Sequence, residues 1–246
     1  MSLDACASLV QRGDPDRFLA VMAAPPAARA VLFPLYAFNL EVARAPQVTR
    51  EPLIAEMRLQ WWRDALAEIA EGRPVRNHEV TVPLAAALTP AAARGLDDLI
   101  LARHCDIGAQ PFADAAALMD YLDRTAGTLL WAGAQSLGAA EGEQALRAWG
   151  RAQGLANWFL ACPALLAQGG TPLPDASGAG IAALAEAALK EIRAVRPPKT
   201  PVLLATWRAK ALLTQARRHP DRVLSGRLAQ SEFRRRGSLL WRSLAG

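Results

Sequence analysis

Apolar residues recur at helical spacing along most of this chain, and no run of alternating β-branched residues indicates a sheet. The clearest example is the segment from about 53 to 71, whose apolar positions share one helical face: Ile54, Met57, Trp61, Ala65, Leu66 and Ile69. Gly72 and Pro74 predict where that helix ends, because glycine and proline commonly follow a helix. The pattern therefore predicts an all-α protein.

Helix starts are marked by a capping residue followed by proline, which is favoured at the first helical position. Helices are expected to begin near residues 15, 90 and 201, after the pairs Asp14-Pro15, Thr89-Pro90 and Thr200-Pro201. Glycines and prolines elsewhere predict about nine helices joined by short loops. Because no linker or repeat divides the chain, we expect one domain over residues 1–246, with a basic helical segment from about 200 to 246.

Composition narrows the class of protein. Ala and Leu supply most of the 52% of residues that are hydrophobic, and both favour helices. No apolar run approaches the roughly 20 residues needed to span a bilayer, and the N-terminus lacks a signal-peptide pattern. Cys6, Cys105 and Cys162 lie far apart, so we expect buried thiols in a reducing compartment. These features predict a cytoplasmic protein, or one peripheral on an inner membrane.

Charge is unevenly distributed along the chain. The net charge is +5, yet residues 193–246 alone carry +11 and the remainder carries −6. Within 233–244, arginines are interleaved with Leu239, Leu240 and Trp241, which is typical of a helix on an anionic membrane surface. The alternative is a solvated helical face that keeps the protein soluble. Nucleic acid is not an expected partner, because no nucleic-acid-binding module accompanies the charge.

Three short motifs carry a family resemblance. They are Tyr36-Ala37-Phe38 followed by a helix with Trp61-Trp62, the run from Tyr121 to Thr128, and Leu155, Asn157 and Leu173-Pro174 near the middle of the chain. Together they resemble the squalene/phytoene synthase family. The resemblance implies an isoprenoid-synthase-like helical bundle around a central cavity. It also implies an enzyme that condenses isoprenoid diphosphates with the help of Mg²⁺.

The family's two acidic motifs are replaced in this chain. Positions matching the first motif hold Ala43, Arg44 and Gln47, and those matching the second hold Ala161 and Leu165. Mg²⁺ prefers carboxylate oxygens and water, so these side chains offer no anionic ligand. We therefore expect no cofactor. Mg²⁺ would be required only if the protein is an active prenyltransferase. Pro46 and Pro163 are also expected to break both motif helices.

A subgroup of the family fits more closely. The pattern Asn39, Glu41 and Ala43, together with the spacing of Gly150 and Gly154, is similar to the subgroup that includes the mitochondrial complex I assembly factor. That resemblance implies a membrane respiratory-complex subunit as partner. Because no mitochondrial presequence is visible, a bacterial relative is expected.

The resemblance also implies a set of ligand-binding residues, with none in a catalytic role: Tyr36, Asn39, Arg44, Arg58, Trp62, Tyr121, Arg124 and Asn157. Arginines 44, 58, 63 and 124 either cluster at the cavity mouth, where they would bind phosphate without metal, or pair with Glu41, Asp64 and Asp123. The tryptophans either line the cavity or pack in the core. Asp97, Asp98 and Asp106 form either a solvated face or a metal site.

Three functions remain open from the sequence. The first is a catalytically degenerate binding or assembly factor for respiratory complex I. The second is an active prenyltransferase that condenses isoprenoid diphosphates with altered ligands. The third is a carrier that binds an isoprenoid or lipid without chemistry.

Overall fold

The computed structural model describes residues 3–49, 51–108 and 110–245, and these residues form helices joined by loops, with no strand among them. The first half contains α1 (Leu3–Gly13), α2 (Pro15–Ala23), α3 (Pro26–Arg44), α4 (Pro52–Ala70), α5 (Thr81–Ala87), α6 (Pro90–Ala102), the 3-10 turn η1 (Arg103–Asp106) and α7 (Ala115–Leu122). The second half contains the π-helical segment η2 (Asp123–Gly127), α8 (Thr128–Ser136), α9 (Glu143–Ala167), α10 (Gly178–Ala194), the 3-10 segment η3 (Pro201–Thr206), α11 (Ala209–Arg218), α12 (Asp221–Leu224) and α13 (Glu232–Ala245). The predicted all-α class is confirmed.

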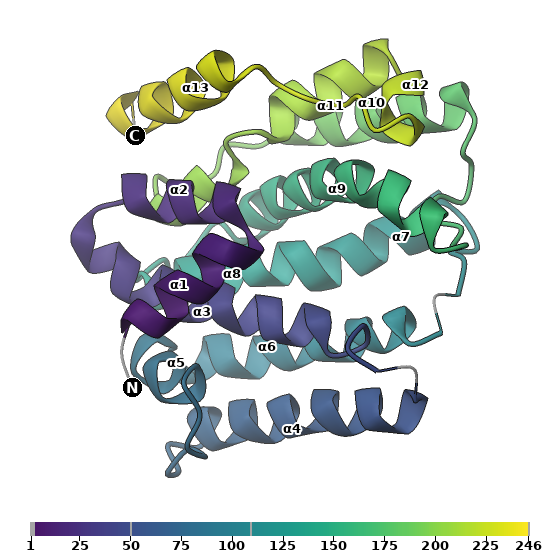
Figure 1. Ribbon diagram of the computed structural model, residues 1–246. Coiled ribbons are helices and arrows are strands. Elements are labelled where there is room, and N and C mark those ends of the chain that lie inside the picture. Colours follow the sequence, from purple (N-terminus) through teal and green to yellow (C-terminus); the bar gives the residue numbers. More distant parts are fainter. Residues whose placement is uncertain (1–2, 50, 109, 246) are drawn as a thin grey trace.

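The long helices stack in successive layers (Figure 1). From the bottom of that view, α4 packs on α6, α6 on α8, α8 on α9, and α9 on α10 and α11. The helices α1, α2 and α3 cover one side, and α13 lies across the top, where it contacts α2 and η3. No helix within the described residues is long and apolar enough to cross a membrane.

The predicted helix starts are confirmed by their caps. The Asp14 carboxylate accepts a hydrogen bond from the backbone N–H of Arg17 (2.9 Å), and the Thr89 hydroxyl accepts one from Ala92 (3.2 Å). Such caps satisfy backbone donors that have no partner inside the helix. At Pro201 the element that begins is a short 3-10 segment, and Thr200 provides no side-chain cap.

The two prolines of the motif helices behave differently from each other. Helix α3 ends at Arg44, just before Pro46, as expected. The expected break at Pro163 is wrong, because α9 continues through it to Ala167. An interior proline removes one backbone hydrogen bond, but Phe159 and Cys162 are fully buried on the same helix. Burial of this helix face outweighs the lost hydrogen bond.

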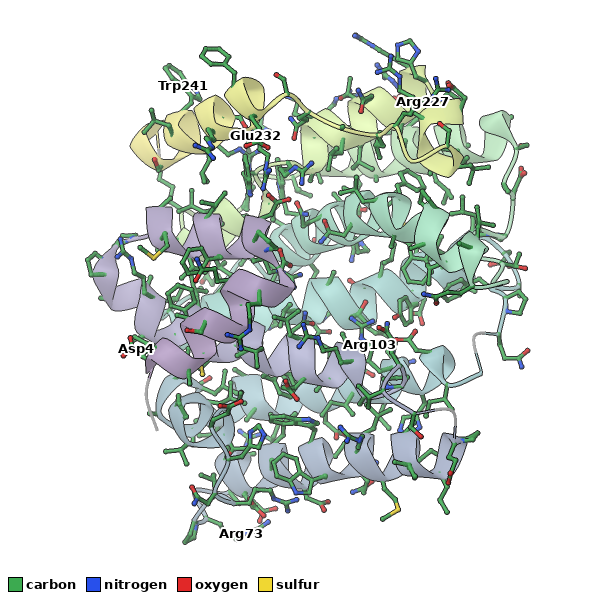
Figure 2. All side chains as sticks on the ribbon, viewed as in Figure 1. Asp4, Arg73, Arg103, Arg227, Glu232 and Trp241 are labelled. Carbon is green, nitrogen blue, oxygen red and sulfur yellow. The ribbon has the colours of Figure 1, made fainter. Side chains whose placement is uncertain are left out.

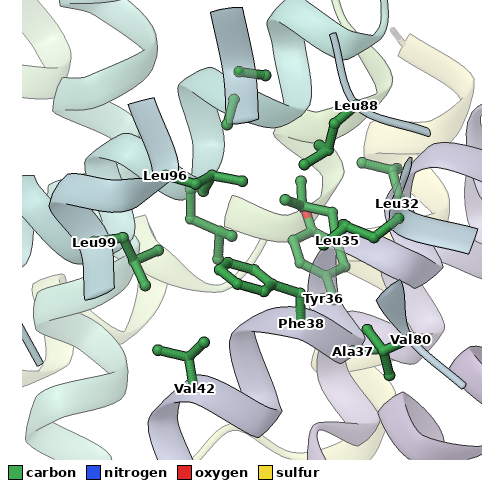
Figure 3. Close-up of a cluster of buried hydrophobic side chains, with 14 of the residues drawn as sticks. Leu32, Leu35, Tyr36, Ala37, Phe38, Val42, Val80, Leu88, Leu96 and Leu99 are labelled. Atoms are coloured by element: carbon green, nitrogen blue, oxygen red, sulfur yellow. The ribbon is translucent and has the colours of Figure 1, made fainter. Parts of the chain in front are cut away.

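One of the two large hydrophobic clusters contains much of α3, and the other joins α9, α10 and α11. Leu35, Tyr36 and Phe38 of α3 are fully buried, and the Phe38 ring lies beside Leu96 of α6 (Figure 3). Burial of each large apolar side chain contributes about 1.5–3 kcal/mol. The motif around Tyr36 therefore lies on a helix that is held from several sides.

The helices α7, η2 and α8 run on as one helix with a π-helical segment in the middle. Gly150 and Gly154 of α9 pack directly against this segment. A Cβ at Gly150 would lie 2.6 Å from the Ala126 carbonyl oxygen, and one at Gly154 would lie 2.7 Å from the Ala126 side chain. The two glycines therefore allow the close approach of α9 to η2. This approach forms one wall of the candidate site, and π-helical segments frequently occur at functional sites.

Candidate functional site

A cavity of about 370 Å³ opens between α3, η1, the α7–η2 helix, α9 and the loop that follows α9. This volume falls within the range of small-molecule sites. Its lining includes Arg17, Asn39, Gln47, Arg103, Cys105, Asp106, Phe112, Tyr121, Thr125, Ala126, Gly154, Asn157, Trp158, Ala161, Leu165 and Thr171. The cavity lies where the sequence motifs converge.

One end of the cavity is polar and closely hydrogen-bonded. The Arg103 guanidinium donates to Tyr121 Oη (2.7 Å) and to Asp106 Oδ2 (3.1 Å), and Tyr121 Oη donates to Asp106 Oδ1 (2.8 Å). Burial raises the pKa of Tyr121, so its hydroxyl stays protonated and able to donate. Burial opposes the charge on Arg103, but the neighbouring Tyr121 and Asp106 still raise the pKa of Arg103. The three side chains form one fixed, nearly neutral group.

An aromatic wall adjoins this polar end, and Tyr121 belongs to both. Phe112, Tyr121 and Trp158 pack against one another with ring centroids 5.3–5.6 Å apart. The Trp158 indole N–H donates to the carbonyl of Pro172 (2.7 Å), which ties the loop after α9 to this wall. An aromatic wall beside one arginine suits a ligand with an apolar body and a polar end.

The motif positions that face the cavity carry no carboxylate. Gln47, Ala161 and Leu165, which the sequence resemblance placed at the family's acidic motifs, all line the cavity. Asp106 is the only acidic residue among the lining residues that the structure describes. Both of its carboxylate oxygens already accept hydrogen bonds, one from Arg103 and one from Tyr121. No group of three or more potential metal ligands forms within the described ranges. This set of donors does not fit a Mg²⁺ ion, which requires several free oxygens.

The eight predicted ligand-binding residues fall in three places. Asn39, Tyr121 and Asn157 line the cavity, and Gln153 donates to the Asn157 side-chain oxygen (2.8 Å). Tyr36 and Trp62 instead lie in the core, where Trp62 packs edge-on against Phe38. Arg44, Arg58 and Arg124 stand outside the cavity lining: the first two are exposed and the third is half-buried.

Of the two alternatives for arginines 44, 58, 63 and 124, the cluster at the cavity mouth does not form, since none of them lines the cavity. Arg63 pairs with Asp97 (2.7 Å) and Arg124 pairs with Asp98 (2.8 Å). Their acidic partners are therefore not the ones that the sequence suggested, because Asp123 pairs with Arg147 and Arg151 instead. Asp97 and Asp98 tie α6 to α4 and η2, a role that neither sequence interpretation included.

Sequence reasoning missed several cavity residues. Arg103 and Phe112 come from the irregular segment between α6 and α7, and Arg17 comes from the first turn of α2. The three-residue spacing of Arg103 and Asp106 was the one available signal, since it places both side chains on one turn. Of the cysteines, Cys6 and Cys162 are buried as expected, with burial raising their pKa to about 11 and about 12. Cys105 is exposed at the cavity, which corrects the expectation for that thiol.

The stacked helices and the cavity between α3, η2 and α9 define the class as an isoprenoid-synthase-like fold. A solved structure described as a dehydrosqualene synthase in complex with ligand matches with a TM-score of 0.78, covering 99% of this chain and 95% of that one. Its sequence is 15% identical, so this likeness shows the fold alone.

The sequence comparison is more specific. The squalene/phytoene synthase family model matches residues 10–222, and the chain belongs to that family. Similar curated proteins are named NADH dehydrogenase (ubiquinone) complex I, assembly factor 6. The Drosophila melanogaster homolog is 30% identical over 169 residues, covering 64% of this chain and 50% of the relative. The Homo sapiens protein is 25% identical over 166 residues, covering 64% and 48%. The chain thus spans about half the length of these relatives.

Proposed function

We propose that this protein is a non-catalytic member of its family that acts as an assembly factor for respiratory complex I. The observation that carries the proposal is the cavity wall formed by Gln47, Ala161 and Leu165. The family's chemistry requires a diphosphate to leave, and metal-bound carboxylates normally stabilise that leaving group. The wall supplies none of them, and Asp106 already pairs with Arg103, so the cavity offers little net charge to a diphosphate that arrives without metal.

The partner in this proposal comes from the relatives. Proteins from Drosophila melanogaster, Bos taurus and Homo sapiens that match this chain are named for complex I assembly. The matched region makes up 64% of this chain. We infer that the same region contacts a membrane subunit of the complex or an assembly intermediate.

A deletion strain of the source organism tests the proposal. We expect less assembled complex I on native gels and lower NADH dehydrogenase activity in membranes, both restored by the wild-type gene. Assembly of another respiratory complex serves as the control and should stay unchanged. Normal complex I assembly and activity in the deletion strain would contradict the proposal.

A second candidate function is supported by the cavity itself, which remains open between an arginine and an aromatic wall. An isoprenoid or lipid bound there would make the protein a carrier, or a prenyltransferase with altered ligands. Purified protein is incubated with farnesyl or geranylgeranyl diphosphate and Mg²⁺, and released pyrophosphate is measured. Sustained release that is lost in Arg103→Gln would establish an enzyme and overturn the non-catalytic proposal. Native mass spectrometry of the purified protein then tests the carrier.

A further inference from the structure

A second cavity lies at the C-terminal end of α2, whereas the central one involves Arg17 in its first turn. It has a volume of about 700 Å³, is open to one side, and is lined by the end of α2, the segment 199–204 and the last turns of α13. Most of its lining is apolar, including Pro25, Leu203, Leu204 and Trp241. None of the family motifs in the sequence contributes to it.

Arg242 and Lys199 line this second cavity, and neither has an acidic partner among the described residues. Arg242 donates one hydrogen bond to Thr206 Oγ1 (3.2 Å) and lies over the Trp149 ring (5.1 Å). Burial alone lowers the pKa of Arg242, and no carboxylate in the described part of the chain pairs with it. Lys199 is exposed at the rim, and the buried Thr200 Oγ1 has no hydrogen-bond partner. A partly buried cation without an anion is unusual, because paired charges are the rule.

Two arginines of α13, Arg235 and Arg242, differ in whether a carboxylate lies beside them. About two turns earlier on the same helix, Arg235 pairs with Asp16 (2.6 Å) and with Glu232 (2.5 Å). Asp16 also pairs with Arg208, so this acid joins α2, α11 and α13. The body of the protein therefore supplies an acidic partner for Arg235 but none for Arg242.

The helix α13 also presents its large apolar residues outward. Phe233, Leu240 and Trp241 are 88%, 62% and 74% exposed, whereas Leu239 is buried. Figure 2 shows Trp241 pointing away from the molecule at the end of α13. The residues that hold the helix to the body are mainly polar, namely Arg235 and Arg242. Such an arrangement suits a helix that lies on a bilayer, where aromatic side chains enter the interface.

We propose that the cavity beneath α13 binds an anionic membrane lipid, with the lipid phosphate at Arg242 and Lys199 and an acyl chain along Leu203, Leu204 and Trp241. Arginine pairs with phosphate through two hydrogen bonds, and the Lys199 ammonium adds a further charged donor. The outward face of α13 brings the cavity opening to the bilayer, since Trp241 belongs to both. The proposal is independent of complex I assembly and of any chemistry in the central cavity.

Binding of soluble short-chain lipids to the purified protein tests the site. The ligands are dihexanoyl phosphatidylglycerol, dihexanoyl phosphatidylcholine and inorganic phosphate, measured by titration calorimetry. We expect phosphatidylglycerol to bind clearly more tightly than the other two. Arg242→Gln should weaken that binding about tenfold, which corresponds to about 1.4 kcal/mol. Equal binding of the two lipids, or inorganic phosphate binding as tightly as phosphatidylglycerol, would overturn the lipid site.

Two lysines provide a matched pair of variants that should not disturb folding. Lys199 and Lys210 are both exposed, and only Lys199 lines the cavity. Lys199→Gln should weaken phosphatidylglycerol binding several-fold, whereas Lys210→Gln should leave it unchanged. The same loss in both variants would show general charge attraction and contradict a specific site. This pair keeps the test decisive even if Arg242→Gln loosens α13.

A vesicle sedimentation assay distinguishes binding of α13 to a bilayer from binding of a lipid in the cavity. Phe233 is exposed on α13 and does not line the cavity. Phe233→Ala should reduce sedimentation with vesicles of phosphatidylcholine and phosphatidylglycerol but leave calorimetric binding of the short-chain lipid intact. Unchanged sedimentation of this variant would contradict a bilayer as the source of the lipid.

Discussion

Two tyrosines of this protein are expected to respond in opposite ways when their hydroxyls are removed. Tyr121 Oη accepts a hydrogen bond from Arg103 (2.7 Å) and donates one to Asp106 (2.8 Å). Tyr36 Oη is buried in the core without any partner. A hydrogen bond to a charged group is worth about 1.5–3 kcal/mol, whereas burying an unpaired polar group costs about 1–3 kcal/mol. The same chemical change therefore removes a favourable interaction at one site and an unfavourable one at the other.

For Tyr121→Phe we expect a loss of about 2–3 kcal/mol in the free energy of unfolding, because Arg103 and Asp106 retain only each other. In a chain of this size, that loss lowers the melting temperature by roughly 4–12 °C. Tyr36→Phe should leave stability unchanged or raise it by about 1 kcal/mol.

Urea unfolding followed by far-ultraviolet circular dichroism measures both variants, with the slope of the transition checking that the denatured state is unchanged. A neutral Tyr121→Phe would refute the hydrogen-bonded group as a stabilising element. A Tyr36→Phe variant that is clearly less stable would show that its hydroxyl is satisfied after all.

Three further substitutions test the packing, the ion pairs and the attachment of α13. Gly150→Ala should cost about 1–3 kcal/mol in urea unfolding, because its Cβ would overlap the η2 backbone. Asp123 is partly buried, but hydrogen bonds and charge from Arg147 and Arg151 lower its pKa, so its contribution to stability should be lost as pH falls below about 4. Asp123→Asn should flatten that acid dependence. Asp16→Asn should accelerate hydrogen exchange in α13 while leaving exchange in α6 unchanged.

Helix starts were predictable from the sequence because their signals are local. The caps at Asp14 and Thr89 each join two residues that are three positions apart, so a short stretch of sequence is enough to predict them. Pro163 was misjudged because its effect depends on burial of Phe159 and Cys162, which the local sequence does not reveal. The π-helical segment η2 was not predicted either, because it packs against Gly150, a residue more than 20 positions away in the sequence.

The site was predictable only where its residues lie on regular helices. Asn39, Tyr121 and Asn157 were found because a motif identifies the helix face that turns to the cavity. Arg103 and Phe112 were missed because they lie in a segment with no periodic pattern. The ion pairs joining distant helices were assigned to the wrong acids, since the choice between Asp97 and Asp64 for Arg63 depends on how α4 and α6 align.

The arginine of the central cavity has a carboxylate partner, and the arginine of the second cavity has none in the described part of the chain. This difference in charge determines which cavity should bind an anion more tightly. Arg103 is already neutralised by Asp106 at 3.1 Å, so an incoming phosphate would meet an attractive and a repulsive charge together. Arg242 has no such carboxylate among the described residues, so the phosphate would restore the interaction that burial removed from the guanidinium. A neutral isoprenoid gains little from either charge but gains from the aromatic wall of Phe112 and Trp158. On these grounds we expect the central cavity to favour an apolar ligand and the cavity beneath α13 to favour an anionic one.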